Sequence, residues 1–300
     1  MAKKRLLPAE RSEAITGYLF SAPFLLLFTL FTIVPIVLSL IISFTDFNML
    51  QFPIFVGMEN YTRLFFGDSV FLKAIGNTLL LAVVTGPLSY LLSFLVAWFI
   101  NELRPGLRAL VTLFFYAPSI SGNMVLVWSV FFSGDSYGYL NSLLLRLNVI
   151  HTPVQWLQTP QYLVPILCIV VLYSSLGTSF LAFIAGFQGV DKSYYEAAAV
   201  DGIRNRWQEL WYVTLPLMKP QLLFSAVMAI TGSFGIGGVI TSLAGYPTVN
   251  YSAHTIMHHL EDYGSTRYEL GYASAIATFL CLLMILCNRL IQRMLAKVGT

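Results

Sequence analysis

The chain has 300 residues, of which 57% are hydrophobic and 10% charged, and its formal net charge is +3 at pH 7. Soluble globular domains carry nearer a quarter of charged residues, so this composition excludes an ordinary soluble protein and indicates a membrane protein. The basic residues are scattered and never form a dense run, which argues against a nucleic-acid-binding surface.

Six stretches without Asp, Glu, Lys or Arg are each longer than the roughly 18 apolar residues that cross a bilayer core. They predict an all-α integral membrane protein with six transmembrane helices, at residues 17–44, 75–100, 109–132, 162–187, 221–244 and 270–291. We expect one transmembrane domain over residues 17–291, with a basic lead at 1–16 and a short tail at 292–300.

The first apolar stretch follows Lys3, Lys4 and Arg5, as the core of a secretory signal would. It is longer than a signal core, however, and no convincing small-residue cleavage site follows it. We therefore expect it to remain as a span.

The cysteines fall within predicted helices and have neither a disulfide framework nor a metal-ligand spacing; they are Cys168, Cys281 and Cys287.

The basic residues predict the orientation, because cytoplasmic loops of membrane proteins are enriched in Lys and Arg. With the N-terminus inside, the outer segments hold four basic residues and the inner segments thirteen. The outer ones are Arg63, Lys73, Arg146 and Arg267. This bias predicts that both termini face the cytoplasm.

The segments between the spans differ in character. The outer segment 45–73 is rich in aromatic and turn residues, which suit the membrane interface. The outer segment 133–161 contains a plausible amphipathic helix at Leu140–Leu147, and the inner segment 188–219 is a polar island in an apolar chain.

The polar island predicts two short helices joined by a sharp turn. Glu196–Val200 consists of helix formers, including three consecutive alanines that leave little side-chain bulk. Asp201-Gly202 then predicts a break, since Gly relaxes the limits on the backbone and Asp favours turns and caps. We expect Leu215-Pro216 to end the second helix, because Pro216 has no amide hydrogen.

The second helix of the island is expected to be amphipathic. Its larger side chains recur at i, i+3, i+4 and i+7, which places them on one helical face; they are Trp207, Leu210, Trp211 and Thr214.

The spacing in the island resembles the EAA loop of the permease subunits of binding-protein-dependent ABC importers. The matching residues are Glu196-Ala-Ala-Ala-Val-Asp-Gly202, twelve further residues, and Leu215-Pro216. Four other stretches resemble the carbohydrate-importing, maltose-type branch: Ser21-Ala22-Pro23, Gly232-Ser233-Phe234, Gly245-Tyr246-Pro247 and Leu270–Ala275. Ile203 departs from the small alanine usual at its position, and Tyr246 interrupts what is often Gly-Gly-Pro.

The resemblance implies a type I ABC importer permease fold with a cytoplasmic coupling loop at about 188–219. It implies four kinds of partner: a second homologous permease subunit, a dimer of ATPase subunits, an extracytoplasmic solute-binding protein, and a sugar or oligosaccharide as solute. Glu196 would contact the ATPase, and Ala197 and Ala198 would allow close packing. Asp201 and Gly202 would form the elbow, and Leu215-Pro216 would close the second helix.

The resemblance also implies a non-catalytic subunit in the plasma membrane of a prokaryote. A P-loop needs Gly-Lys followed by Ser or Thr, and this sequence contains no Gly-Lys pair. We therefore expect that the chain itself binds no cofactor and no metal, and that ATP and magnesium are bound by the partner ATPase.

Polar and aromatic residues in the predicted helices suit a carbohydrate, which needs hydroxyl partners and an aromatic face. The candidates for the solute path are Asn123, Tyr173, Ser175, Ser233 and Phe234. Ser and Thr in membrane helices also bond simply to neighbouring backbone. Other solutes within the same architecture are glycerol phosphates, polyamines and peptides.

Two other classes of protein compete with this interpretation. A secondary transporter usually keeps ionisable residues in the bilayer, but the charge-free cores of the predicted spans have no carboxylate, lysine, arginine or histidine. An intramembrane enzyme would need buried catalytic groups, whereas the histidines fall in predicted outer loops. His254 and His258 share a helical face, and we expect them to be a surface pair rather than a metal site.

Overall fold

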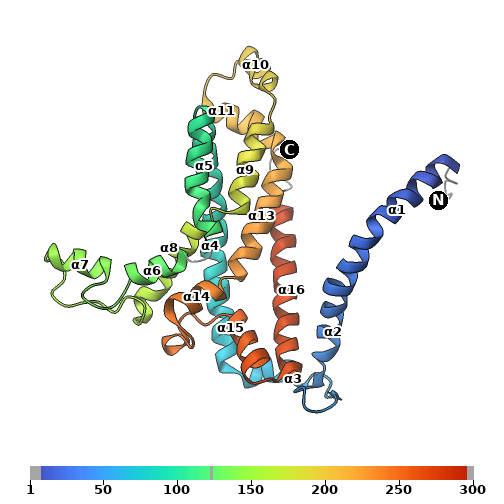
Figure 1. The fold of residues 1–300 in the computed structure, drawn as a ribbon, viewed down its shortest axis with the longest axis vertical. Coiled ribbons are helices and arrows are strands. Elements are labelled where there is room, and N and C mark those ends of the chain that lie inside the picture. Colours follow the sequence, from blue (N-terminus) through green and yellow to red (C-terminus); the bar gives the residue numbers. More distant parts are fainter. Residues whose placement is uncertain (1–7, 122–123, 296–300) are drawn as a thin grey trace. The chain divides into compact units, whose positions relative to one another are not determined.

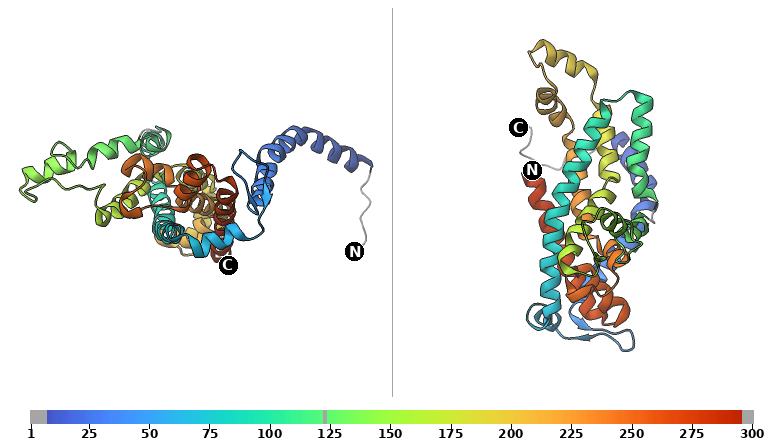
Figure 2. Two further views of the ribbon diagram at one scale, coloured as in Figure 1. Left: turned by 90° about the horizontal axis from the view of Figure 1, so that it is seen from below. Right: turned by 90° about the vertical axis from the view of Figure 1, so that its left-hand side faces the viewer.

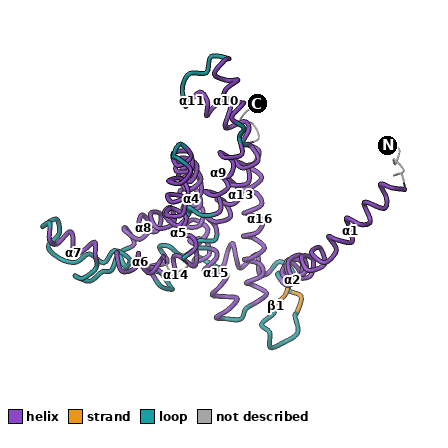
Figure 3. The backbone as a smooth tube through the Cα atoms, turned by 45° about the horizontal axis from the view of Figure 1, so that its top comes forward, coloured by secondary structure: helices purple, strands orange, loops and turns teal. Residues whose placement is uncertain are grey.

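The computed structural model describes residues 8–121 and 124–295, and the chain forms two compact units. Unit 1 consists of the chain up to Gly67 together with Leu260–Phe279, and unit 2 consists of Asp68–His259 and the chain from Leu280 onwards. Nearly all of the regular structure is helical, as Figure 3 shows. Each unit is described by itself.

Unit 1 begins with one helical run made of three consecutive elements: α1 (Pro8–Phe28), the π-helical turn η1 (Thr29–Ile33) and α2 (Val34–Ile42). From Thr16 to Ile42 this run is long and apolar enough to span a membrane. The predicted span at 17–44 is therefore helical apart from its last two residues. Pro23 and Pro35 lie inside the run without ending it.

The rest of unit 1 is built around a two-residue antiparallel ladder. Its elements are β1 (Thr45–Asp46), β2 (Ile54–Phe55), α3 (Glu59–Thr62), the π turns η2 (Arg63–Gly67) and η5 (Asp262–Thr266), and the start of α16 (Leu270–Leu295). The Asn60 amide donates to the carbonyls of Ser43 and Thr45 at 2.9 Å each. The Gly271 amide donates to the Phe47 carbonyl at 3.0 Å, which ties the start of α16 to the ladder.

Unit 2 contains the remaining helices (Figure 1). They are α4 (Ser69–Asn101), α5 (Pro105–Ile120), α6 (Met124–Phe131), α7 (Tyr139–Arg146), α8 (Pro160–Ser174), α9 (Thr178–Gly189), α10 (Lys192–Val200), α11 (Arg206–Glu209), η3 (Leu210–Thr214), α12 (Leu215–Leu217), α13 (Lys219–Phe234), α14 (Gly237–Ala244), η4 (Val249–Tyr251), most of α15 (Ile256–Glu261) and the part of α16 from Leu280. The expected amphipathic helix at 140–147 is α7.

The core of unit 2 lies where α4, α9 and α13 pack side by side (Figures 1 and 2). Phe183 of α9 is fully buried and meets Phe94 of α4 edge to face, with ring centroids 5.3 Å apart. Ser179 and Ser225 exchange hydrogen bonds of 3.2 Å between α9 and α13. Aromatic packing and paired hydroxyls thus hold these three helices together.

By length and composition, three helices of the described chain could each cross a membrane, and bent helix pairs raise the number to six. The single helices are Thr16–Ile42, Ser69–Asn101 and Leu270–Met294. The pairs are α5 with α6, α8 with α9, and the run Arg206–Leu217 with α13.

Three predicted spans are wrong as single helices. The span at 109–132 is divided between α5 and α6, after Pro118 and Ser121 weaken the helix. The span at 162–187 is broken between Ser174 and Thr178, with a bend of 41°. The span at 221–244 is broken at Gly235, where α13 ends and α14 follows. A Gly or Pro lies at or near each break.

The expectation of a surface histidine pair is also wrong. His254 and His258 are each 1% exposed, because Thr and Tyr side chains and the N-terminal half of α4 enclose them. A polar loop sequence can still fold into the interior when its side chains find partners there.

Gly271 allows α16 to start against the ladder of unit 1. A Cβ at this position would overlap the Thr45 carbonyl oxygen and lie 3.1 Å from the Phe47 amide nitrogen. We predict that Gly271→Ala destabilises the protein by about 1–3 kcal/mol, since backbone must move to admit the methyl group. Thermal unfolding of the purified protein in detergent measures this effect.

The matched control is Gly76→Ala in α4, where an added Cβ meets nothing within 4 Å. We expect that change to be neutral or to stabilise by up to about 1 kcal/mol. Equal melting temperatures for the two variants would contradict the described approach of α16 to the ladder.

Candidate functional site

The polar island folds as a helix–turn–helix, which we call the bracket (residues 191–217). It lies at one end of unit 2, beyond α9 and α13 (Figures 1 and 2). Asp191 caps the first arm, α10: its carboxylate accepts a hydrogen bond from the Ser193 amide at 2.9 Å. Hydrogen bonds from Ser193 also hold the pKa of Asp191 below its ordinary value.

The turn after α10 is a Schellman motif, in which a left-handed residue lets two amides reach back to the last helical carbonyls. Gly202 has φ +94°, its amide donates to Ala199 at 3.3 Å, and the Ile203 amide donates to Ala198 at 3.0 Å. The position after the left-handed residue commonly takes an apolar side chain. Ile203 therefore has a local structural role. Figure 3 shows the loop that follows, leading into the second arm.

The second arm starts with a cap that sequence reasoning missed. The Asn205 side chain accepts from the Gln208 amide at 2.8 Å, and the Gln208 side chain accepts from the Arg204 amide at 3.0 Å. An Asn followed three residues later by Gln is a capping-box pattern, and it could have been found before the structure.

Two expectations about the second arm need correction. The arm does not bury one face at i, i+3, i+4 and i+7: Leu210 and Thr214 are buried, whereas Trp207 and Trp211 are 66% and 65% exposed. The π-helical turn Leu210–Thr214 changes the register.

The helical run also does not end at Leu215-Pro216. It continues one residue beyond Pro216, to Leu217. An 81° bend then leads into α13. Leu215 and Pro216 are both half-buried.

The bracket is fastened to the turn between α4 and α5. Arg206 pairs with Glu102 at 3.1 Å and with Glu209 of its own arm at 2.8 Å. The rings of Trp98 and Trp207 meet with their centroids 4.9 Å apart. A polar cavity of about 410 Å³ lies between this turn, the end of α9 and the bracket.

The bracket also presents an exposed face. Glu196 and Ala197 are exposed, and Ala198 is buried. Val200 is 88% exposed and Tyr212 is 68% exposed. Large apolar side chains beside a carboxylate on a rigid element are typical of a protein-binding surface.

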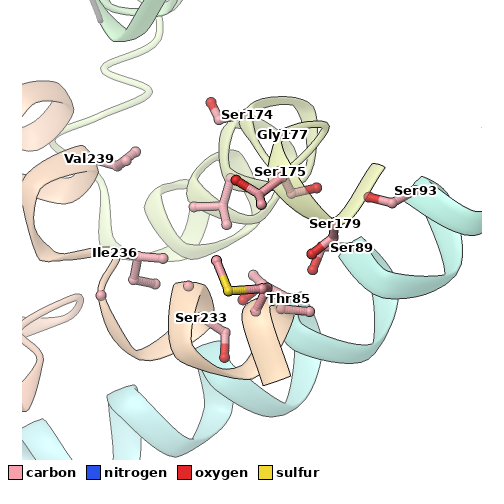
Figure 4. A pocket seen from close by; sticks show the side chains of 16 residues that line it. Thr85, Ser89, Ser93, Ser174, Ser175, Gly177, Ser179, Ser233, Ile236 and Val239 are labelled. Carbon is pink, nitrogen blue, oxygen red and sulfur yellow. The ribbon is translucent and has the colours of Figure 1, made fainter. Parts of the chain in front are cut away.

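A second feature of unit 2 is a hydroxyl-lined cavity of about 270 Å³ (Figure 4). It lies where the breaks after α8 and α13 face α4. The polar residues that line it are Thr85, Ser89, Ser93, Ser174, Ser175, Thr178, Ser179 and Ser233. The side chains around it are all uncharged, and Ile236 and Val239 complete one wall.

The hydroxyls of the cavity are mostly tied to the backbone of their own helices. Thr85, Ser175 and Ser233 each donate to a carbonyl, at 2.7, 2.6 and 2.7 Å. Their lone pairs stay available, so each can accept a hydrogen bond from a solute. Ser93 and Ser174 have side-chain oxygens without a hydrogen-bond partner among the described residues. The cavity can thus both donate to and accept from a neutral polyol.

The structure brings only some of the expected solute-path residues to this cavity. Ser175 and Ser233 line it. Phe234 is buried and lines a separate apolar pocket, and Tyr173 packs edge to face on Trp128. Asn123 lies outside the described residues.

Sequence reasoning missed the stripe on α4. Thr85, Ser89 and Ser93 recur every four residues, which places three hydroxyls on one face of a helix made mostly of apolar residues. This four-residue spacing is the signal from which the stripe could have been predicted.

Apolar helices broken beside a polar cavity, with a polar bracket at one end, are features of a multi-pass membrane protein with a path between its helices. Residues 89–298 match the family described as binding-protein-dependent transport system inner membrane component, and the chain belongs to that family.

Three known proteins illustrate the likeness. The chain is 31% identical to the probable ABC transporter permease protein YesP of Bacillus subtilis (strain 168), covering 89% of this chain and 86% of that one. It is 29% identical to the lactose transport system permease protein LacF of Rhizobium radiobacter, with coverages of 75% and 74%. A crystal structure of a bacterial alginate ABC transporter in complex with alginate pentasaccharide-bound periplasmic protein has a chain of the same fold, with TM-score 0.76, 24% identity and coverages of 96% and 98%.

The left-handed backbone at Gly202 should make this position intolerant of side chains. We predict that Gly202→Ala destabilises the turn by roughly 1–2 kcal/mol, because a Cβ is strained at positive φ. Hydrogen–deuterium exchange of residues 197–206 should then speed up by a factor of about 5–30.

The control is Gly106→Ala in α5, which also has open space around an added Cβ but no positive φ. Unchanged exchange in Gly202→Ala would show that the turn is not held in this conformation.

Proposed function

We propose that this chain is a transmembrane permease subunit of an ABC importer that forms the translocation path for a sugar or oligosaccharide. The observation that carries the proposal is the hydroxyl-lined, uncharged cavity at the helix breaks. Membership of the binding-protein-dependent family supports the transporter class. The lactose and alginate relatives support the carbohydrate class.

The chemistry of the cavity favours a carbohydrate over the other solutes. A glycerol phosphate or a polyamine carries charge, and moving a charge into low dielectric is costly unless an opposite charge meets it. The cavity offers hydroxyls and apolar carbon instead, which match the hydroxyls and C–H faces of a sugar ring. Small-molecule sites usually measure about 300–1,000 Å³. The cavity of about 270 Å³ is slightly smaller than this range. Its size suits one wall of a path that a second, homologous permease subunit completes.

The bracket is the proposed docking element for a separate ATPase. Its exposed Glu196 and apolar side chains offer contacts, and Ala197 allows close approach. The Schellman turn at Asp201-Gly202 keeps the arms rigid. Leu215-Pro216 then directs the second arm toward the bend into α13. Motion of the bracket would therefore reach the helices that line the cavity.

The charge bias supports an orientation with both termini and the bracket in the cytoplasm of a prokaryotic cell. Thirteen of the basic residues lie on that side in this arrangement and four on the other. In the proposal this chain is non-catalytic and binds no cofactor; ATP and magnesium belong to the ATPase dimer. An extracytoplasmic solute-binding protein delivers the sugar from the opposite side.

Affinity purification of the tagged chain from crosslinked native membranes, followed by mass spectrometry, tests the assembly. We expect a Walker-type ATPase, a second permease and a solute-binding protein. Proteoliposomes with these components should then take up a labelled carbohydrate in an ATP-dependent manner. Recovery of the chain alone, with ATP-independent uptake, would favour a self-sufficient carrier.

The bracket assignment predicts a specific defect for Glu196→Lys. This change should abolish ATP-driven uptake by reversing a charge at the docking surface, while membrane insertion and melting temperature stay unchanged. Glu59→Lys on α3, an exposed glutamate outside the bracket, is the matched control. Normal uptake and normal ATPase recovery in Glu196→Lys would refute the docking role.

The cavity assignment predicts a change in apparent affinity for Ser175→Ala. Losing one hydrogen bond worth about 0.5–1.5 kcal/mol should raise the KM of uptake roughly 2- to 10-fold. Ser129→Ala in α6 is the control, because Ser129 makes the same kind of bond to a carbonyl three residues earlier but does not line the cavity. If both variants kept the parental KM, Ser175 would not contact the solute.

A further inference from the structure

Three buried histidines of unit 2 are a feature that the proposed transport function does not explain. His254 and His258 are 1% exposed and His259 is 3% exposed, around the start of α15. Neutral or charged, an imidazole is rarely enclosed so fully without hydrogen-bond partners.

A hydrogen-bonded chain runs through two of these rings. The Asp68 carboxylate lies 2.9 Å from His259 Nε2, and His259 Nδ1 lies 3.2 Å from His254 Nε2. A carboxylate only accepts, so His259 donates from Nε2, and a single proton serves the bond between the two rings. His254 Nδ1 has no hydrogen-bond partner among the described residues. A proton added there would give a buried, unpaired N–H and a buried charge.

The third histidine connects this chain to α14. His258 Nε2 lies 3.0 Å from Thr241 Oγ1 of α14, and His258 Nδ1 lies 2.8 Å from Thr255 Oγ1. The Tyr246 ring stacks on His258 with an interplanar angle of 13°. At the start of α14, a Cβ on Gly237 would lie 3.2 Å from the Met257 side chain, so this glycine allows Met257 to pack closely on α14.

The same segment is fastened to α4. The Asn77 amide donates to the carbonyls of Tyr251 and His254 at 2.9 Å each, and the Ile256 amide donates to Thr78 Oγ1 at 2.9 Å. The 33-residue α4 therefore provides the support, and the histidines connect α14 to it.

The start of α14 borders the hydroxyl-lined cavity. Ile236 and Val239 line that cavity, and the break at Gly235 separates α14 from α13 (Figure 4). A short helix after a glycine break can change its angle without disturbing the helix before it, because few backbone hydrogen bonds cross the break.

We propose that α14 is a movable cover of the cavity, and that Asp68, His254, His258 and His259 form a clamp that holds it closed and releases it on protonation. The titratable groups that face the histidines from neighbouring elements are Asp68 at the start of α4, and Tyr246 and Tyr251 ahead of α15.

The pH dependence of the clamp follows from burial. Burial, and then the neighbouring His259 and His258, lower the pKa of His254 from 6.5 to about 4, against an opposing effect of Asp68. Burial also lowers the pKa of His258. The closed form thus binds fewer protons than an open form with ordinary histidines. The clamp is fully stable above about pH 6.5. As the pH falls from there toward about 4, the equilibrium constant for closing decreases by up to tenfold per pH unit for one histidine.

Distance measurements between α14 and α4 test the clamp directly. Spin labels would be placed at Ser242 and Val83, both exposed, in a variant whose native cysteines are replaced by alanine. Double electron–electron resonance of the full chain in nanodiscs at pH 7.5, 6.5 and 5.5 reports the fraction in the longer-distance population. We expect that fraction to rise up to tenfold when the pH is lowered from 6.5 to 5.5. It should fall back to its initial value when the pH is restored to 7.5.

His254→Gln removes the proton acceptor, and its amide can still reach His259. We expect its distance distribution to change less with pH than that of the parent, whereas the control His151→Gln, an exposed loop histidine, should behave like the parent. If His254→Gln fails to insert, His258→Gln provides the same comparison with its amide near Thr241.

A parent distribution that does not change with pH would overturn the proposal, and so would a His254→Gln variant that opens like the parent. The inference rests on the proposed function only in taking the cavity as the solute path. The distance measurements need neither ATP nor solute. Failure of the clamp proposal and failure of the transporter assignment can therefore be distinguished.

Discussion

The structure depends on one constraint: in hydrocarbon, each backbone amide and carbonyl must find its hydrogen-bond partner within the protein. Helices meet this requirement by themselves, so almost all of the regular structure is helical. A helix can be broken only where other polar groups can supply the missing bonds. The breaks after α8 and α13 occur at Ser175–Gly177 and Gly235, and the hydroxyl-lined cavity lies at these two breaks. The interruption of the helices and the polarity of the cavity thus have a common cause.

The same constraint explains what could be predicted from the sequence. Charge-free stretches locate apolar helices because burying an unpaired charge is costly, and α4 and the runs that contain α2 and α16 coincide with them. The elbow at Asp201-Gly202 was predictable because only glycine adopts positive φ readily. Thr85 and Ser89 could have been found from their four-residue spacing. These features are local properties of the sequence.

The remaining features depend on tertiary partners. Leu210, in the π turn at Leu210–Thr214, is buried in a cluster formed with side chains of α4 and α9, and no local pattern records this packing. His254 and His258 have the polarity of a loop, yet they are buried in a segment that is tied to residues nearly two hundred positions earlier: Asn77 bonds the His254 carbonyl, and Asp68 bonds the neighbouring His259. A long-range hydrogen bond of this kind has no signature in a single sequence.

Helix α13 gives these separate elements a physical connection. It begins at the 81° bend after the bracket and ends at the break before α14. The Arg206–Glu102 ion pair is well exposed to solvent, and such pairs contribute at most about 1 kcal/mol. The bracket is therefore held mainly by the Trp98–Trp207 contact and by the buried Leu210 and Thr214. Any displacement of the bracket acts on α13 along continuous backbone, and at the far end of α13 the glycine break, the histidine contacts and the packing of α14 on α6 and α8 determine whether α14 follows.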